Sequence, residues 1–513
     1  MNGATDAPWP AEPEAPLRTL ARNVGTRYLF VVAEMIVGLL TLPFNLRHLG
    51  PEAYGLWMLT AGITVHFSIL DLGYGGAIVK FVAQYRSQRD TRSLNEIAST
   101  IFVLFAVLGV LVYLAVIALA FHLDTFLNIT PAQAETGKWI LLIVGLNAAV
   151  NFGFSTFGGI CAGFQRYDIN NMVAIVSSFV IAAVNVAMVL MGYGLIPLVA
   201  ATTAVRLGTY FVYWRNAYKV FPQLRVRPSL FRTARLREVT AFSIYASMID
   251  WANKLNYELD EIVIGIFLGA TPVAIWAVAD RIISATQRLT NQSNTVLFPM
   301  IVDSDVGQKL GRLQTVLIEG TRLSLATVTP IAIVLLVLSE PIVRAWVGPQ
   351  MLAAVPVIQV LAFAVALRVA TATGTTLLKG SGHVRYLAFV NLGTGAANVV
   401  LSAALIKPFG LVGVAVGTLI PILVSSVFLT FPVACRRVQV PVGEAVRRAV
   451  WPAVWPAIAV AVALAAVHRP TDTLPVALAE AAAAGLLYVG LFIIAVGRRD
   501  RANYTARIWE LAT

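Results

Sequence analysis

About fourteen apolar stretches, each long enough to cross a lipid bilayer, follow one another along the chain. The bilayer core offers no water to exposed backbone groups, so such stretches fold into helices that satisfy their own hydrogen bonds. A hydrophobic content of 58% with only 12% charged residues is far from the balance of a soluble domain. The sequence therefore predicts an all-α integral membrane protein with about 14 transmembrane helices.

The bounds of these predicted spans follow the points at which hydropathy falls. Each span is long enough for a hydrocarbon core of about 30 Å. The predicted spans cover residues 24–46, 54–79, 97–121, 138–162, 170–191, 194–214, 238–267, 271–301, 322–345, 352–378, 385–406, 409–434, 449–467 and 474–496.

Basic residues decide the orientation of the spans. When residues near the ends of spans are assigned to the adjoining segments, 28 of the 38 Lys and Arg residues belong to one side of the membrane, five to the other side and five to the interior of spans. Cytoplasmic loops of membrane proteins carry the excess of Lys and Arg, so we expect both termini to be cytoplasmic. The same asymmetry accounts for the net charge of +12 without a nucleic-acid partner.

Sequence motifs of enzymes and metal sites are absent. Cys161 and Cys435 form no CxxC pair, and the five histidines show no metal-ligand spacing. No Walker A, HExxH or GxSxG sequence occurs. We therefore expect no metal, no cofactor and no catalytic residue, and hence a protein that is not an enzyme.

A short repeat divides the chain. The Leu-Gly pair and the Trp of HLGPEAYGLWML (48–59) recur in FLGATPVAIWAV (267–278), displaced by 219 residues. Chance is the alternative, since Trp is common near membrane ends. The longest basic loop, however, lies where two halves would join. The predicted domains are a disordered tail (1–17), a six-helix bundle (18–214), a basic cytoplasmic linker (215–237), a second six-helix bundle (238–434), and two accessory helices with a tail (435–513).

Charged residues inside the spans point to function, because a charge at the bilayer centre costs about 2.5–3.5 kcal/mol on insertion scales. They fall on polar stripes of the first, second, seventh and eighth spans, and we expect these spans to line a hydrated cavity. The alternative is that pairs such as Asp250 with Lys254 only hold helices together. Four stripes argue against this, since buried ion pairs rarely repay their desolvation.

Several segments together resemble a known family. They are RNVGTRY, RHLGPEAYGLW, ILDLGYGGAIVKFVAQY, YELDEIVIGIFLG and WVGPQMLAAVPVIQVLA. The chain resembles the polysaccharide-exporting flippases, the Wzx-type transporters of the multidrug/oligosaccharidyl-lipid/polysaccharide (MOP) superfamily. The resemblance implies two pseudo-symmetric six-helix bundles around a central cationic cavity, plus two C-terminal helices. It also implies alternating access that moves a polyprenyl-(pyro)phosphate-linked oligosaccharide to the outer leaflet.

The same resemblance assigns roles to the charged residues in and near the spans. Five bases would bind the anionic head group: Arg27, Lys254, Arg281, Arg288 and Arg368. Four acids would couple transport to an ion gradient: Glu34, Asp71, Asp250 and Asp280. The implied setting is the bacterial cytoplasmic membrane, with a lipid-linked oligosaccharide as substrate and polysaccharide polymerase and export machinery as partners.

Three other functions remain open at this point. A multidrug exporter of the same superfamily would favour an acidic cavity, which the five bases within spans disfavour. A membrane glycan polymerase or ligase usually needs a large external loop, and the longest one here, 122–137, is short. A passive scaffold would have no need of the polar stripes.

Overall fold

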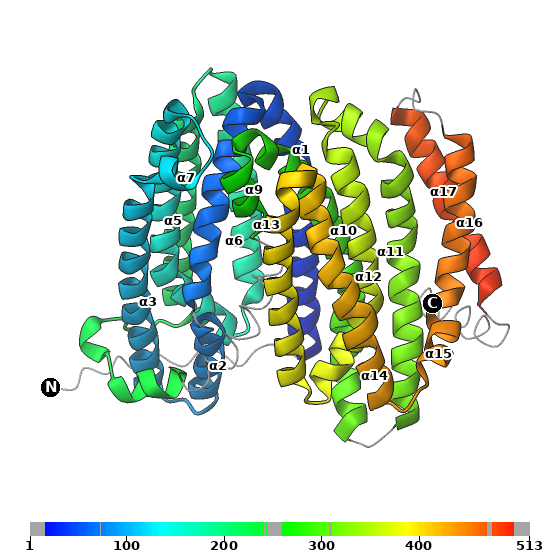
Figure 1. The fold of residues 1–513 in the computed structure, drawn as a ribbon. Coiled ribbons are helices and arrows are strands. Elements are labelled where there is room, and N and C mark those ends of the chain that lie inside the picture. The colour runs from blue at the N-terminus through cyan, green and yellow to red at the C-terminus, as the bar shows by residue number, and fades with distance from the viewer. Residues whose placement is uncertain are drawn as a thin grey trace. The chain divides into compact units, whose positions relative to one another are not determined.

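The computed structural model describes residues 16–71, 73–240, 243, 259–306, 310–468 and 474–496. Across these ranges every regular element is a helix (Figure 1). In the described part of the chain, ten helical segments are long and apolar enough to cross a membrane. The predicted all-α membrane fold is confirmed, and the total of 14 spans stays a prediction.

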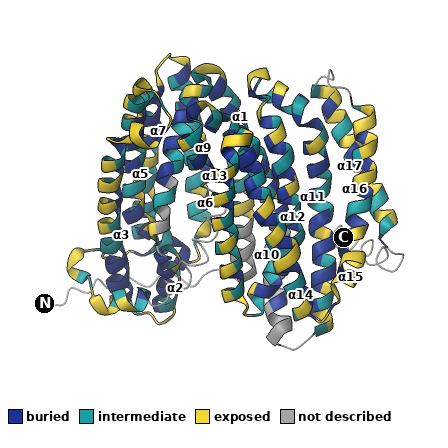
Figure 2. Ribbon diagram, in the orientation of Figure 1, coloured by how far each residue is buried: buried dark blue, intermediate teal, exposed yellow. Residues whose placement is uncertain are grey.

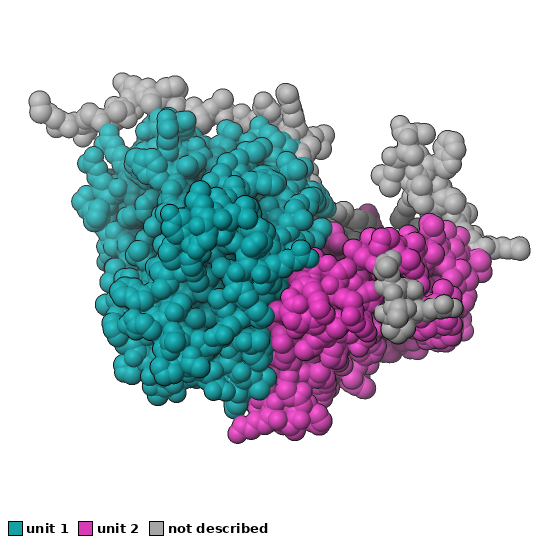
Figure 3. Space-filling view, turned by 90° about the horizontal axis from the view of Figure 1, so that it is seen from above, with its two compact units in different colours: residues 1–274 teal, residues 275–513 magenta. Residues whose placement is uncertain are grey.

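The chain folds into two compact units, residues 1–274 and 275–513 (Figure 3). Buried and exposed residues alternate along the helices of each unit (Figure 2). The exposed residues include large apolar side chains such as Leu114, Leu190 and Phe428. Apolar exposure on this scale is what contact with lipid requires of a protein surface.

The first unit is built on long helices, with α5 packed between α3 and α7 (Figure 1). Its elements are α1 (Pro16–His66), the 3₁₀ turn η1 (Phe67–Asp71), α2 (Tyr74–Ser87), α3 (Thr91–Ala120), α4 (Leu123–Phe126), α5 (Pro131–Gly163), α6 (Tyr167–Leu190), α7 (Leu195–Val220), the 3₁₀ turn η2 (Pro228–Leu230), α9 (Asp260–Phe267) and the start of α10 (Ala270–Val306).

In the second unit α11 is central, since α12 packs against it and so do α16 and α17. Its elements after α10 are α11 (Leu310–Trp346), the 3₁₀ turn η3 (Pro349–Met351), α12 (Ala354–Gly380), α13 (Val384–Leu423), the π-helical η4 (Val424–Thr430), α14 (Phe431–Arg437), α15 (Val442–Ala445), the π-helical η5 (Val446–Val450), α16 (Trp451–Val467) and α17 (Leu474–Ala495).

The repeat predicted from sequence has a counterpart in the backbone. Gly50 bends α1 and Gly269 separates α9 from α10, and both adopt a left-handed conformation, with φ of 80° and 88°. Glycine is the residue that occupies this region without steric cost. Two further pairs of left-handed residues recur at offsets of 217 and 218 residues, namely Gln165 with Gly382 and Gly192 with Gly410. Helix junctions therefore recur along the chain at a nearly constant offset, as the predicted repeat requires, while the two six-helix bundles stay a prediction.

The stretch 54–79, which the sequence predicts as one span, consists of two helices joined by a turn. Helix α1 ends at His66, η1 follows, and Gly73 with a φ of 73° precedes α2. A side chain at Gly73 would strain this left-handed junction, which explains why the helix does not continue. Hydropathy alone does not reveal the break, because the residues on both sides of it are apolar.

Close approach of backbones holds the second half of α1 against α9 and the first turn of α10. A Cβ on Gly55 would collide with the backbone carbonyl of Ala270, and one on Gly265 would collide with the side chain of Leu59. Small residues permit this approach between membrane helices. Helix α9, predicted within the second bundle, therefore contacts α1 inside the first compact unit.

Candidate functional site

Among the described residues, the densest group of candidate residues lies on α10. Ser284 Oγ donates to both carboxylate oxygens of Asp280, at 3.2 and 3.3 Å. Arg281 and Arg288 interact electrostatically with the same carboxylate. Arg288 is exposed and the other three side chains are partly buried. One acid beside two bases leaves this part of α10 with a net positive charge.

Helix α10 is not among the ten helices that are apolar enough to cross a membrane, although the sequence predicts residues 271–301 as the eighth span. The charged and hydroxyl residues between 280 and 288 lower its hydropathy. A helix of this kind is stable within a membrane only where it faces protein or water. Its place as a span stays a prediction.

Two of the candidate residues lie on α1. The guanidinium of Arg27 lies over the ring of Phe30, 5.2 Å from its centroid, and Glu34 is partly buried. Ile36 and Leu40 are exposed, and at 100° per residue they fall on nearly the opposite side of the helix. Helix α1 therefore presents a polar stripe and an apolar exposed face in different directions.

The start of the polar stripe on α1 also has a packing role. Asn23 donates from Nδ2 to the carbonyl of Gln165 at 3.0 Å and accepts from the backbone N–H of Asp168 at 3.2 Å. Arg22 adds an ion pair to Asp168 at 3.5 Å. These contacts fix the beginning of α1 to the turn between α5 and α6.

Asp71 has a clear structural use. Its Oδ1 accepts a hydrogen bond from the backbone N–H of Gly75 at 3.0 Å, in the first turn of α2. A carboxylate at this position satisfies a free N–H group and interacts favourably with the helix dipole. Its predicted role in ion coupling stays a prediction.

The other candidates are placed less closely together. Arg368 is partly buried on α12. Asp250 and Lys254 lie outside the described residues. Glu261 of α9, on the predicted polar stripe of the seventh span, lies against α1, where its Oε2 is 2.6 Å from the place of a Cβ on Gly62. The first unit thus brings Glu261 of the predicted seventh span against Gly62 of the predicted second span.

Sequence reasoning missed a second polar site, where residues 223–232 bind the first turns of α3. Asn95 donates to the carbonyl of Gln223 at 3.0 Å and accepts from the N–H of Arg225 at 2.8 Å. Ser99 donates to the carbonyl of Arg225 at 3.2 Å and accepts from the N–H of Arg227 at 3.1 Å. The side chains of α3 thus pair with this segment much as a neighbouring strand would.

A buried carboxylate anchors the end of the same segment. Glu96 pairs with Arg235 at 3.3 Å, with Arg92 at 3.1 Å and with Arg232 at 4.0 Å. Its side chain is only 10% exposed. We call residues 223–235, held by Asn95, Glu96 and Ser99, the linker clamp. Helix α7 continues to Val220 and helical structure resumes at residue 233, so the predicted linker 215–237 is irregular only over residues 221–227 and 231–232, on either side of η2.

Tyr85 extends the linker clamp toward α2. Its hydroxyl donates to Glu238 at 2.9 Å and accepts from Arg235 at 2.7 Å. Burial, together with the hydrogen bond to Glu238, raises the pKa of Tyr85 to about 12. A signal for this site was present in the sequence as a run of polar residues, 91–100, at the start of an otherwise apolar helix.

Comparison with known proteins gives consistent matches. The family model described as polysaccharide biosynthesis protein matches residues 20–304. The probable flippase AglR of Haloferax volcanii is 23% identical over 418 residues, covering 80% of this chain and 82% of its own. The succinoglycan biosynthesis transport protein ExoT of Rhizobium meliloti is 23% identical over 378 residues, covering 72% and 71%.

Solved structures of similar fold are also known. The lipid II flippase MurJ, in an inward closed conformation, matches with a TM-score of 0.75 at 16% identity, covering 91% of this chain and 98% of its own. An inward-facing multidrug resistance MATE family transporter of the MOP superfamily matches with a TM-score of 0.62 at 14% identity, covering 80% and 98%. At these identities the likeness concerns the fold.

Proposed function

Because the chain belongs to the polysaccharide biosynthesis protein family, we propose that it is a flippase for a lipid-linked oligosaccharide. It moves this substrate from the inner to the outer leaflet of a bacterial cytoplasmic membrane for assembly of a surface polysaccharide. The family match and the MOP-superfamily fold confirm the resemblance to the Wzx-type transporters. The names of AglR and ExoT, a flippase and a polysaccharide transport protein, support the proposal.

The observation that carries the substrate class is the positive surplus on α10. Arg281 and Arg288 share one carboxylate, that of Asp280. Arg288 is exposed, so its guanidinium is accessible to a ligand. A planar guanidinium binds a phosphate or diphosphate through two parallel hydrogen bonds. A lipid-linked sugar diphosphate would meet these groups with its head, whereas an organic cation would be repelled.

The two faces of α1 suit an amphipathic substrate. Its polar stripe, with Arg27 and Glu34, would contact the head group, and its exposed apolar face would contact lipid chains. We assign transport to alternating access, in which the left-handed glycine junctions at Gly50 and Gly73 permit helices to bend. Coupling to an ion gradient would use the acids Glu34, Asp71, Asp250 and Asp280.

The alternative functions are less well supported. A multidrug exporter shares the fold, so the fold does not separate it from a flippase. The charges do, since an exporter of organic cations would not benefit from two arginines beside one acid. For a polymerase or ligase, the outer loop 122–137 is shorter still in the structure, because α4 and the start of α5 occupy much of it.

Transport assays in proteoliposomes test this proposal. We would measure translocation of a fluorescent polyprenyl-pyrophosphate oligosaccharide by the intact protein and by the Arg288→Gln variant, with imposed proton or sodium gradients. Losing a charge-assisted hydrogen bond costs about 1.5–3 kcal/mol, so we expect translocation to fall about 10- to 160-fold.

A matched control is Arg344→Gln, which removes an exposed arginine that pairs with Glu340 at 2.6 Å. This variant should transport as the intact protein does. Transport of organic cations but of no lipid-linked glycan, by folded intact protein, would favour the drug exporter instead. Equal transport by Arg288→Gln and intact protein would remove α10 from the binding site.

A further inference from the structure

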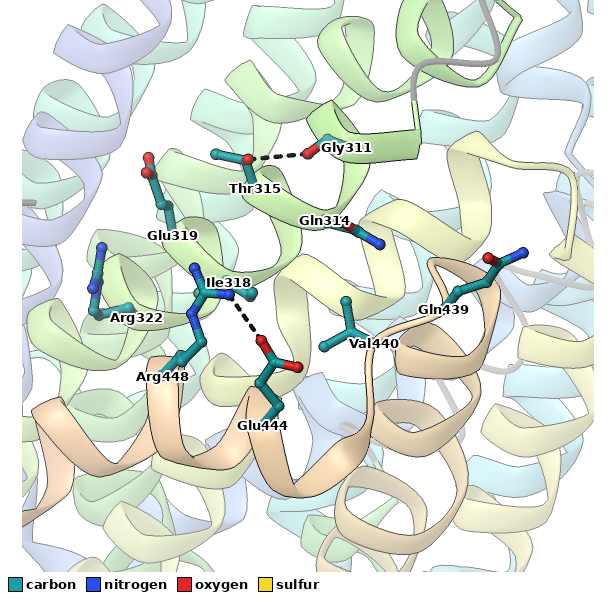
Figure 4. Close-up of a pocket in the computed structure, with 10 residues that line it drawn as sticks. All are labelled: Gly311, Gln314, Thr315, Ile318, Glu319, Arg322, Gln439, Val440, Glu444 and Arg448. Atoms are coloured by element: carbon teal, nitrogen blue, oxygen red, sulfur yellow. Dashed lines mark hydrogen bonds and ion pairs between the residues drawn. The ribbon is translucent and has the colours of Figure 1, made fainter.

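The second unit holds a polar cavity of about 180 Å³ beside the first turns of α11 (Figure 4). Its other walls are the turn after α14 and the segment formed by α15 and η5. A cavity needs only about 10–15 Å³ to hold one water, so this one accommodates a small polar group. None of its lining residues is a candidate residue of α1, α10 or α12.

Four charged side chains line the cavity and balance each other. Glu319 and Arg322 come from α11, and Glu444 and Arg448 come from the start of the accessory helices. Arg322 is buried, with 4% of its surface exposed. Glu444 and Arg448 pair at 2.9 Å while keeping 44% and 55% of their side chains exposed. An anion would meet two carboxylates here and a simple cation two guanidiniums, so a ligand carrying both charges fits best.

Uncharged polar groups complete the lining. Figure 4 shows Gln314 and Gln439 on the other side of the cavity from the four charged side chains. Gln439 has a φ of 58°, a left-handed conformation in which Gly or Asn is usual. The wall at this point therefore carries backbone strain, which clusters at functional positions in proteins.

The exposed residues beside the cavity are of the kinds found where lipid headgroups meet a membrane protein. Leu323, directly after Arg322, is 46% exposed and begins the apolar part of α11. On the other wall Val446 and Trp451 are exposed, and Trp is the residue that marks the membrane–water interface. A ligand in the cavity would therefore be continuous with the surrounding lipid.

We propose that this cavity binds the headgroup of a zwitterionic phospholipid, a primary ammonium joined to a phosphate diester. Arg322 and Arg448 bind the phosphate, and Glu319 and Glu444 accept hydrogen bonds from the ammonium. The lipid joins α11 to the segment that leads into α16 and so gives the accessory helices a role as a lipid-binding element. This inference is independent of the transported substrate.

Native mass spectrometry of delipidated protein tests it, with phosphatidylethanolamine, phosphatidylcholine and phosphatidylglycerol added in turn. We expect one phosphatidylethanolamine to bind about tenfold more tightly than the other two lipids, because a quaternary ammonium has no N–H donor and an anionic headgroup has no ammonium. Arg448→Gln and Glu319→Gln should each weaken this binding about tenfold. The control Arg344→Gln, which removes an exposed ion pair elsewhere on α11, should leave it unchanged.

Competition by soluble glycerophosphoethanolamine distinguishes a lipid headgroup from a soluble ligand that carries the same phosphate and ammonium groups. Failure of this compound to compete assigns the cavity to the lipid, whereas competition at equal concentration assigns it to a soluble ligand. Equal affinity for all three lipids would overturn the proposal, and so would unchanged binding by both variants. Arg448 is half exposed, so its substitution should not disturb folding, and the melting temperature checks this.

Discussion

Replacing Glu96 by Gln should release the linker clamp. The substitution keeps the shape of the side chain but removes the charge that pairs with Arg235, Arg232 and Arg92. Arg92 is 85% exposed and Arg232 is 50% exposed, so their ion pairs contribute little. Arg235 is only 24% exposed, and a hydrogen bond to a charged group contributes about 1.5–3 kcal/mol.

We take about 2 kcal/mol as the expected loss, because Arg235 keeps hydrogen bonds to Tyr85, Ser93 and Glu238. Such a loss raises the population of the open linker about 30-fold. Trypsin cuts after Arg225 only when the segment leaves α3, so limited proteolysis at this bond should accelerate by the same factor when reclosing outpaces cleavage.

Fragment appearance on gels, with cut sites assigned by mass spectrometry, measures this rate. Glu135→Gln is the matched control, because it removes a carboxylate that is 61% exposed and pairs with Lys138 at 2.7 Å. That control should be cleaved as the intact protein is. Cleavage of Glu96→Gln within about threefold of the intact rate would refute the reasoning, since the free energy lost from the closed linker would then be at most about 0.7 kcal/mol.

Two further outcomes follow from packing and titration. Gly55→Ala should lower the melting temperature or prevent folding, because its Cβ would collide with the backbone carbonyl of Ala270. The control Gly25→Ala has open space around the new Cβ and should leave the melting temperature unchanged. Equal melting temperatures of the two variants would contradict the close contact between α1 and α10. Tyr85, with its pKa raised to about 12, should ionise only well above pH 10, so the stability it contributes is fully present below pH 10 and is lost as pH rises through 12. The difference in absorbance at 295 nm between intact protein and Tyr85→Phe measures this titration, and a midpoint near 10 would contradict it.

Hydropathy predicts where the helices lie more reliably than where they begin. It places the starts of the third and fourth spans at residues 97 and 138, whereas α3 begins at Thr91 and α5 at Pro131. The missing turns are polar, so an apolar window does not include them. Their caps are nevertheless visible in the sequence, since Asp90 accepts from the N–H of Ser93, and Thr130 with Gln133 forms a capping box.

The sequence predicts which residues are candidates for the site, but it does not predict which residues they contact. The charges of Asp280 and Arg288 stand out in the sequence because charged residues are costly, and therefore rare, in segments predicted to cross a membrane. The cap that Asp71 forms on α2 depends on the turn at Gly73, which hydropathy does not reveal. The linker clamp joins residues about 130 positions apart, such as Asn95 and Arg225, and no local pattern encodes such a pairing.

The linker clamp changes what the connection between the two predicted six-helix bundles can do. A free loop after Val220 would be a flexible connection, so the following helices could move without displacing α7 or α3. Here the chain is fastened to α3 through Asn95 and Ser99, and helical structure resumes by residue 233. The connection is therefore short and rigid, and its fixed point is the start of α3 rather than the end of α7.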